Sequence, residues 1–384
     1  MLSHIHQQFY EKLSHILDTK HWKFYIVSLS VFSILFFSFP YYKRITDELQ
    51  QKQDRYLKWQ HLKAHAAHPF TQIEAPPESH QAKLTFRLTM PLLMRALQYN
   101  IIAFYLCQAL LGIAFCWVLA DFSYKQFNNK ILAGYITFGI ANIYAGASFF
   151  VDTLASYDPF AYFFLLAAIA YRNPFSIFSM IQLAAWTDER GLIASCFVYI
   201  FWLLNLHDFS KNITFNSLFK FSSQLIAIIG SWLTYLILRF GLSYFIGLYT
   251  PTGDVGFDIF IENIKLSGIG VWTGLEGFWL LILILLIVLL YKKDYLLISI
   301  LAFATFIITF TAVVVYDITR SISHLYLLIP IACYILHRKI SEKELYKVIL
   351  ASTTVSFLFP LYFVKNNMTY MEPIYLRVLE IIAK

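Results

Sequence analysis

Charged residues are scarce in this sequence. Only 14% of its 384 residues are Asp, Glu, Lys or Arg, whereas a soluble domain carries about 25%. So few charges cannot solvate the surface of a globule of this size, which excludes a soluble enzyme. The hydrophobic share of 59% and the mean hydropathy of +0.60 also exclude a disordered chain.

Cysteine is scarce as well. All four cysteines lie inside apolar segments, and none belongs to a CxxC pair. This excludes a secreted disulfide scaffold, and we interpret the four residues as small hydrophobic side chains in helix packing. They are Cys107, Cys116, Cys196 and Cys333.

The net charge of +7 does not indicate a nucleic-acid partner. The lysines and arginines stand at the edges of apolar segments, where such residues anchor helices and meet anionic lipid headgroups. We therefore expect the bilayer itself as the partner of this positive charge.

Long apolar segments are abundant. In residues 275–290, for example, Glu276 is the only charged residue, and runs of about 20 apolar residues are typical of membrane-spanning helices. The pattern predicts an all-α, polytopic transmembrane protein with about eleven spans, folded as a single membrane domain over residues 1–384. The predicted spans are 24–40, 99–121, 131–151, 159–171, 174–186, 192–207, 222–249, 275–291, 295–316, 323–336 and 348–365.

Three consecutive spans between Pro159 and His207 are shorter than a full crossing requires. Short helices are tolerated when they pack among others or open into a water-filled cavity. We therefore expect this trio to line a cavity.

Lysine and arginine in the short loops predict the orientation. With the N-terminus in the cytosol, the short outer loops carry only Arg190, Lys265 and Arg320, whereas the cytosolic segments carry fourteen such residues. This asymmetry follows the positive-inside rule. The outer loop 41–98 carries nine more, but at about 60 residues it is at the length where the rule stops applying. We expect a multi-pass protein of the cytoplasmic membrane.

The first outer loop is expected to hold two helices that lie on the membrane interface. Residues 41–63 mix polar and apolar residues without Gly or Pro, and residues 78–97 follow the break at Pro76-Pro77. The other long outer loop, 250–274, contains five glycines and is expected to be irregular.

Acidic and basic residues collect at the predicted outer ends of the spans. Because they all face one compartment, they indicate a site at the outer surface that holds an anionic group, although salt bridges capping helix ends would give the same pattern. Three consecutive charges at 188–190 stand between two short apolar runs, where burial is costly unless the charges are paired or bind a ligand. The residues are Asp152, Asp158, Asp188, Glu189, Arg190, Asp317 and Arg320, with Asp47, Glu48 and residues 78–87 from the first outer loop.

The segment 78–87 shows a second pattern. On a helix, His80, Lys83 and Arg87 share one face, and two cations with a histidine suit a phosphate. Glu78 or His80 would then be placed to remove a proton from an attacking hydroxyl. An ordinary juxtamembrane anchor of basic residues would show the same spacing.

Two further positions have plain structural interpretations. Asp317 and Arg320 stand one helical turn apart and fit an ion pair. His324, at the mouth of the next span, is interpreted as a helix-end residue.

Several known patterns are absent from the sequence. It contains no Gly-rich nucleotide loop, no GxSxG and no HExxH. Inside the predicted spans the main ionisable residue is Arg239, whereas ion-coupled transporters need acidic residues at mid-depth. We interpret this shortage of acids as an argument against a transporter.

The layout resembles the GT-C superfamily of membrane glycosyltransferases. The stretches 150–161 and 186–192 place acidic residues at the outer ends of the third and fifth spans. A cytosolic N-terminus, one span and a long outer loop with interfacial helices precede them. The resemblance covers roughly residues 24–207 and is one of architecture, without a signature motif.

The resemblance implies a cavity open to the outer leaflet and a polyprenyl-phosphate sugar as donor. It also implies a base from the first outer loop. Asp47 and Glu48 stand close after the first span, as is usual in the family, whereas the neighbours of Glu78 suit a phosphate; we favour Glu78 slightly. The implied catalytic candidates are Glu78, His80, Asp47 and Glu48, and the implied substrate-binding candidates are Lys83, Arg87, Asp152, Asp158, Asp188, Glu189, Arg190, Asp317 and Arg320.

The predicted function is therefore sugar transfer at the outer face, to a glycan, lipid or protein acceptor. A divalent cation held by Asp152, Asp188 and Glu189 and metal-independent chemistry both remain open. The alternatives are a lipid-linked oligosaccharide or solute transporter, an envelope polysaccharide polymerase or ligase, and a scaffold without catalysis. For the enzyme we expect alanine at Glu78, Asp188 or Arg190 to abolish transfer and to leave expression intact.

Overall fold

The computed structural model describes residues 2–38, 57–73, 84–153, 157–209, 211–219, 221–250, 257–315, 317–365 and 367–382. Over these ranges the chain is all-α, as the sequence predicts, apart from one antiparallel hairpin of β1 (Tyr362–Val364) and β2 (Met368–Tyr370). The helices are α1 (Leu2–Leu17), α2 (Trp22–Phe37), α4 (Leu57–Ala67), α5 (Thr89–Ala96), α6 (Ile101–Phe127), α7 (Lys130–Asn142), α8 (Tyr144–Val151), α9 (Asp158–Ala170), α10 (Pro174–Thr187), α11 (Glu189–Asn205), η3 (Phe215–Phe219), α12 (Ser223–Ile246), α13 (Phe257–Leu275), α14 (Phe278–Tyr291), α15 (Tyr295–Val313), α16 (Ile318–Ile322), η4 (Ser323–Leu327), α17 (Leu328–Lys339), α18 (Glu342–Leu358) and α19 (Ile374–Ile382).

Several of these helices are suited to a membrane. By length and composition α6, α12, α15 and the run Ile318–Lys339, formed by α16, η4 and α17, could each cross one. The bent pairs α7–α8 and α13–α14 pass the same test jointly, with bends of 59° and 83°. The described chain thus holds four to six candidate spans. Each predicted segment overlaps a helix, but the count of about eleven spans stays a prediction.

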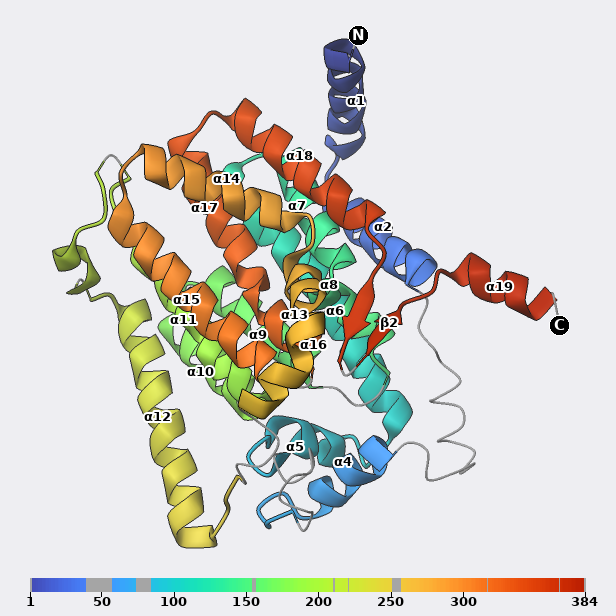
Figure 1. Ribbon diagram of the computed structural model, residues 1–384, viewed down its shortest axis with the longest axis vertical. Helices are drawn as coiled ribbons and strands as arrows, with labels where there is room; N and C mark the ends of the chain where they lie inside the picture. Colours follow the sequence, from blue (N-terminus) through green and yellow to red (C-terminus); the bar gives the residue numbers. More distant parts are fainter. Residues whose placement is uncertain are drawn as a thin grey trace.

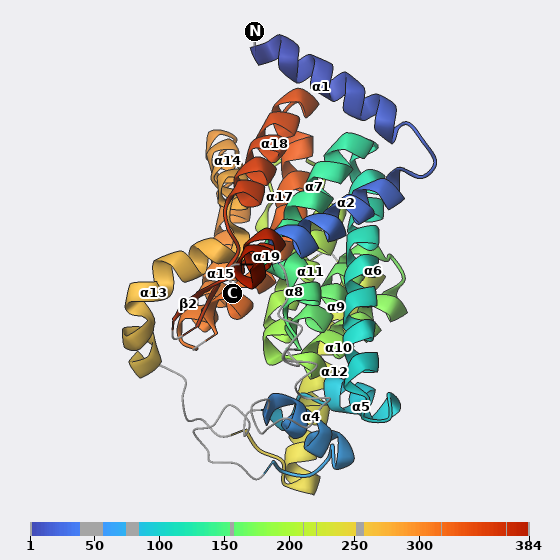
Figure 2. The ribbon, with the colours of Figure 1, turned by 90° about the vertical axis from the view of Figure 1, so that its right-hand side faces the viewer.

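The run Ile318–Lys339 forms the centre of the bundle. Its apolar window is 100% buried, compared with 33% for α6 and 22% for α12, and a helix that is apolar and buried on all sides belongs in the core. Its α17 portion packs among α14, α18, α11 and α6 (Figures 1 and 2). The Tyr162 hydroxyl of α9 donates to the backbone carbonyl of Arg320 at 2.7 Å. This bond holds α16 against α9 and so positions Arg320.

The segment 250–274 is mostly helical, and the expectation of an irregular loop is wrong. Two of its glycines, Gly270 and Gly274, stand one turn apart on α13 and face α16. A Cβ at these positions would lie 2.5 Å from the Ile318 side chain and 2.6 Å from the Ile322 side chain. The glycines therefore allow close packing of two helices and do not mark a flexible loop.

Gly277, at the bend between α13 and α14, packs on the backbone of α18. A Cβ there would lie 2.2 Å from the carbonyl oxygen of Ser352 and 2.7 Å from the backbone nitrogen of Ser356. Because backbone atoms cannot swing aside, we expect Gly277→Ala to destabilise the protein by roughly 1–3 kcal/mol, measured by unfolding in detergent micelles. Gly230→Ala in α12 is the control, since nothing lies within 4 Å of that position. Equal stability of the two variants would contradict this account.

Helices α4 and α5 form a small layer across one end of the bundle (Figures 1 and 2). Trp59 of α4 is buried and packs edge-on against Phe104 of α6, with ring centroids 5.6 Å apart. Its indole N–H donates to the carbonyl of Thr153 at 3.2 Å. These helices fall within residues 41–98, where the sequence predicts an outer loop with interfacial helices; residues 39–56 and 74–83 lie outside the described ranges.

Candidate functional site

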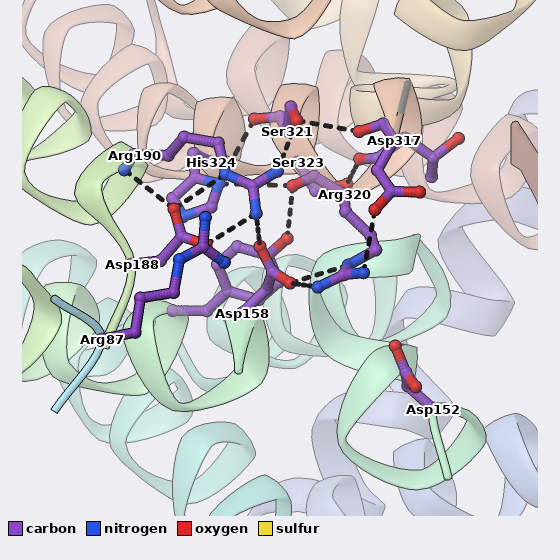
Figure 3. A network of polar contacts seen from close by, with 12 residues as sticks. Arg87, Asp152, Asp158, Asp188, Arg190, Asp317, Arg320, Ser321, Ser323 and His324 are labelled. Carbon is purple, nitrogen blue, oxygen red and sulfur yellow. Dashed lines mark hydrogen bonds and ion pairs between the residues drawn. The ribbon is translucent and has the colours of Figure 1, made fainter. Parts of the chain in front are cut away.

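A network of charged side chains lies at the end of the bundle that α5 covers (Figure 3). It joins Arg87, which precedes α5, to the start of α9, the junction of α10 and α11, and α16. These segments lie far apart in the sequence, and the fold brings them together at the same end of the bundle.

Asp158 is the centre of this network. It is the first residue of α9 and is fully buried. Its Oδ1 accepts a hydrogen bond from Nη2 of Arg190 at 2.8 Å, and its Oδ2 accepts one from Nε of Arg320 at 2.7 Å. One carboxylate thus links α9 to α11 and α16, and both of its oxygens are occupied by guanidinium groups.

Asp188 has two roles at the junction of α10 and α11. Its Oδ1 accepts from the backbone N–H of Arg190 at 2.9 Å, which caps α11. The same carboxylate pairs with Nη2 of Arg190 at 2.7 Å and Nη1 of Arg87 at 2.6 Å. Burial alone would raise the pKa of Asp188, but the guanidiniums of Arg190 and Arg87 outweigh it and hold that pKa well below its ordinary value. Asp188 therefore fixes two arginines.

His324 is buried beside this network. It lies in η4, where its ring packs edge-on against Tyr162 with centroids 4.8 Å apart. Its Nδ1 lies 3.3 Å from the carbonyl oxygens of Arg320 and Ser321. The Ser321 hydroxyl in turn accepts a hydrogen bond from Arg190. The histidine thus packs behind the arginines and helps to hold α16 in place.

One side of the network is more exposed and is called the cationic rim: Arg87, Glu189 and Arg239. Glu189 bridges the other two, with Oε2 3.2 Å from Nε of Arg87 and Oε1 3.2 Å from Nη1 of Arg239. The Arg239 guanidinium stacks on the ring of Phe86 at 4.1 Å and donates to the Thr250 hydroxyl at 2.9 Å. Arg87 and Arg239 have side chains that are 11% and 25% exposed. This side carries two cations against one acid.

The other side is called the acidic rim: Asp152, Asp317 and Lys365. Asp317 pairs with Nη1 of Arg320 at 3.1 Å and with Lys365 at 3.6 Å. Asp152 stands apart from the ion pairs drawn in Figure 3, on the side of Arg320. Its Oδ2 accepts a hydrogen bond from the Tyr144 hydroxyl at 3.1 Å.

The charges of the network balance. Its four arginines (Arg87, Arg190, Arg239, Arg320) meet four carboxylates (Asp158, Asp188, Glu189, Asp317), and mutual pairing makes the burial of charge tolerable. Arg190 and Arg320, expected from the sequence to hold a phosphate, are engaged by the two buried aspartates. Arg239 is the most open of the four arginines, with a side chain that is 25% exposed.

The structure therefore gathers most of the predicted site residues that it describes. Arg87, Asp158, the charges at 188–190, Asp317 and Arg320 form one network, and Asp152 lies beside it. The remaining predicted site residues lie outside the described ranges; they are Asp47, Glu48, Glu78, His80 and Lys83.

Sequence reasoning missed the importance of two charged residues within predicted spans, Arg239 of the network and Glu276 outside it. Arg239 was noted only as an isolated cation of a predicted span, although a lone arginine in an apolar helix is itself a signal of a functional partner. Glu276 was overlooked as a buried acid. It is fully buried, has a left-handed φ of 47°, and neither carboxylate oxygen forms a hydrogen bond among the described residues. Its signal was its position as the only charge in residues 275–290.

A metal site is not apparent in the part of the chain that the structure describes. No group of three or more His, Cys, Asp or Glu side chains there is arranged to hold a metal ion.

The fold and the network define the class of protein: an all-α chain with four to six candidate membrane spans and a charge network at one end. No family model, curated protein or solved structure matches this chain.

Proposed function

We propose that the chain is a membrane glycosyltransferase that transfers a sugar from a polyprenyl-phosphate donor at the outer face of the cytoplasmic membrane. The observation that carries this proposal is the charge network centred on Asp158, gathered at one end of a bundle of apolar helices. Charged groups at membrane depth are expensive and mark functional sites by default. Two opposite rims around a rigid core would suit a ligand with an anionic end and a hydroxyl-rich end.

The cationic rim is the proposed binding site for the donor phosphate. The Arg239 side chain is 25% exposed and is more open than those of Arg190 and Arg320, at 14% and 4%, and an arginine offers a phosphate a planar pair of donors. Stacking on Phe86 and pairing with Glu189 hold Arg239 in a fixed position. Such preorganised cations would stabilise the charge that develops on the departing phosphate.

The acidic rim is the proposed place of the base that activates the acceptor. Both oxygens of Asp158 and of Asp188 accept from arginines, so these two carboxylates serve as positioning groups. Asp152 is hydrogen-bonded to a neutral phenol through Oδ2, and among the described carboxylates we favour it as the base. The acids of the first outer loop remain the alternative that the resemblance implies.

The outer location is supported by the distribution of basic residues. Lys292, Arg338 and Lys339 lie where α14 and α17 end, at the end of the bundle away from α4 and α5 (Figure 1). Positive charge marks the cytosolic side, so the network would face the opposite compartment.

The test is a transfer assay with purified protein and radiolabelled polyprenyl-phosphate sugars. We expect Arg239→Ala to weaken donor binding by roughly tenfold or more, because a charge-assisted contact to phosphate contributes about 1.5–3 kcal/mol. Lys265→Ala, an exposed cation of α13, is the matched control and should behave as wild type. Repeating the assay with EDTA tests the need for a divalent cation.

Absence of donor binding by the wild-type protein, for every sugar tried, would refute the proposal. Binding without transfer would leave the site in place and shift the function toward a transporter. An envelope polysaccharide polymerase or ligase would differ mainly in its acceptor and would appear as transfer to a glycan chain.

A transporter is the second candidate, and one observation favours it. Glu276 is a buried acid with no hydrogen-bond partner among the described residues, and it lies at the 83° bend between α13 and α14. Transporters build coupling sites at such broken helices. The presence of Glu276 removes the argument against a transporter that was based on a shortage of acidic residues in the spans. Proteoliposomes would decide: transport that Glu276→Gln abolishes supports this candidate, and transfer chemistry that the same variant retains supports the enzyme.

A further inference from the structure

A second site lies at the end of the bundle away from α4 and α5. A groove of about 560 Å³ is bordered there by the end of α14, the end of α17 and the start of α18. Figure 1 shows these helix ends at the top of the view, with α4 and α5 at the bottom. The groove therefore belongs to neither rim of the charge network.

One wall of the groove is cationic. Lys292 and Arg338 are exposed and form no ion pair among the described residues. Each lies near an aromatic ring instead, Lys292 at 5.8 Å from that of Tyr291 and Arg338 at 5.3 Å from that of Tyr334. Cation–π contacts orient a charge without neutralising it. Both cations thus remain available to an anion.

The other charges in the groove are already committed. Lys339 forms a buried ion pair with Asp294 at 3.1 Å. Glu344, the one acid in the lining, accepts from the backbone N–H and the hydroxyl of Ser341 at 3.1 Å and 2.8 Å in a capping box. After these pairings the groove presents two cations to one capped acid.

The opposite wall is apolar and continues along a helix face that faces away from the bundle. Ile287 lines the groove, and it is exposed together with Leu283 and Leu290 of α14. Tyr291, at the end of this face, is 82% exposed, and aromatic residues in that position are typical of the headgroup level of a bilayer. A lipid would contact both walls, with its phosphate beside the cations and its acyl chains along α14.

We propose that this groove binds an anionic phospholipid of the leaflet on that side. The phosphate lies between Lys292 and Arg338, and the acyl chains follow the exposed face of α14. A free anion would use only the cationic wall, and a neutral lipid only the apolar wall. Because the groove combines a cationic wall with an adjoining apolar helix face, an anionic lipid fits it best.

The test measures lipid binding to the full chain in detergent, by native mass spectrometry and thermal unfolding. The probes are phosphatidylglycerol, phosphatidylcholine and inorganic phosphate. We expect phosphatidylglycerol to bind and to raise the melting temperature, and phosphatidylcholine to do neither. The double variant Lys292→Gln/Arg338→Gln should weaken phosphatidylglycerol binding roughly 10- to 30-fold, because each cation near a headgroup contributes about 1 kcal/mol.

Lys343→Gln is the matched control, since Lys343 is an exposed lysine of α18 outside the groove, and it should bind as wild type does. If the control lost as much phosphatidylglycerol binding as the double variant, the effect would depend on net charge alone, and the proposal would be overturned. So would a wild-type protein that does not distinguish the two lipids, or inorganic phosphate that stabilises as well as the lipid. The three substituted side chains are exposed, so unchanged melting temperatures without lipid show that the variants are folded.

Discussion

Purified Asp158→Ala protein is expected to be about 3–5 kcal/mol less stable than the wild type. Asp158 is fully buried and accepts from both Arg190 and Arg320, the latter with a side chain only 4% exposed. Its removal leaves each arginine with a single carboxylate partner in a place that water barely reaches. Unfolding by denaturant in detergent micelles, followed by far-ultraviolet circular dichroism, measures the loss.

A surface ion pair provides the control for Asp158. Asp121 pairs with Lys23 and Lys125, and its side chain is 28% exposed, so Asp121→Ala should cost no more than about 1 kcal/mol. In the double variant Asp158→Ala/Arg320→Ala the loss should fall short of the sum of the single losses by about 0.5–3 kcal/mol. Strict additivity would mean that the two side chains do not interact in solution.

This expectation changes how alanine variants of the network are interpreted. From the sequence alone we expect alanine at Asp188 or Arg190 to abolish transfer and to leave expression intact. Asp188 is fully buried, the Arg190 side chain is only 14% exposed, and both belong to the same set of ion pairs. We now expect their alanine variants to lose folded protein, so that lost activity in them would not identify a catalytic group.

The helices could be predicted from the sequence because apolar runs are a local signal. The gathering of Asp158, the charges at 188–190 and Arg320 at one end could also be predicted, since alternate helix ends return to the same side. The pairing could not, because the bonds of Asp158 join residues 32 and 162 positions apart. Nor could the burial of His324, which depends on Tyr162 from another helix.

The glycines of residues 250–274 show the limit of local signals. A glycine marks a loop when its neighbours are exposed and a packing surface when another helix approaches. Only the position of Ile318 and Ile322 opposite Gly270 and Gly274 decides between the two, and that position depends on the tertiary fold.

The second prediction concerns the base. If Asp152 removes the acceptor's proton, Asp152→Asn should lower kcat roughly 100- to 10,000-fold. Stability should change by only about 1 kcal/mol, since the amide has the shape of the carboxylate and can still accept the hydrogen bond from Tyr144. A loss of kcat without a loss of stability separates this residue from Asp158. The measurement is steady-state transfer together with unfolding in the same detergent.

Two controls make the assignment specific. Asp317→Asn should be much less affected in kcat, because Asp317 pairs with Arg320 and Lys365 and serves to place them. Tyr144→Phe keeps the carboxylate and removes its hydrogen bond, so it should retain most of the activity. If Asp152→Asn retains transfer and Glu78→Gln loses it, the base lies in the first outer loop. In that case, the resemblance to membrane glycosyltransferases would predict the position of the base better than the described network does.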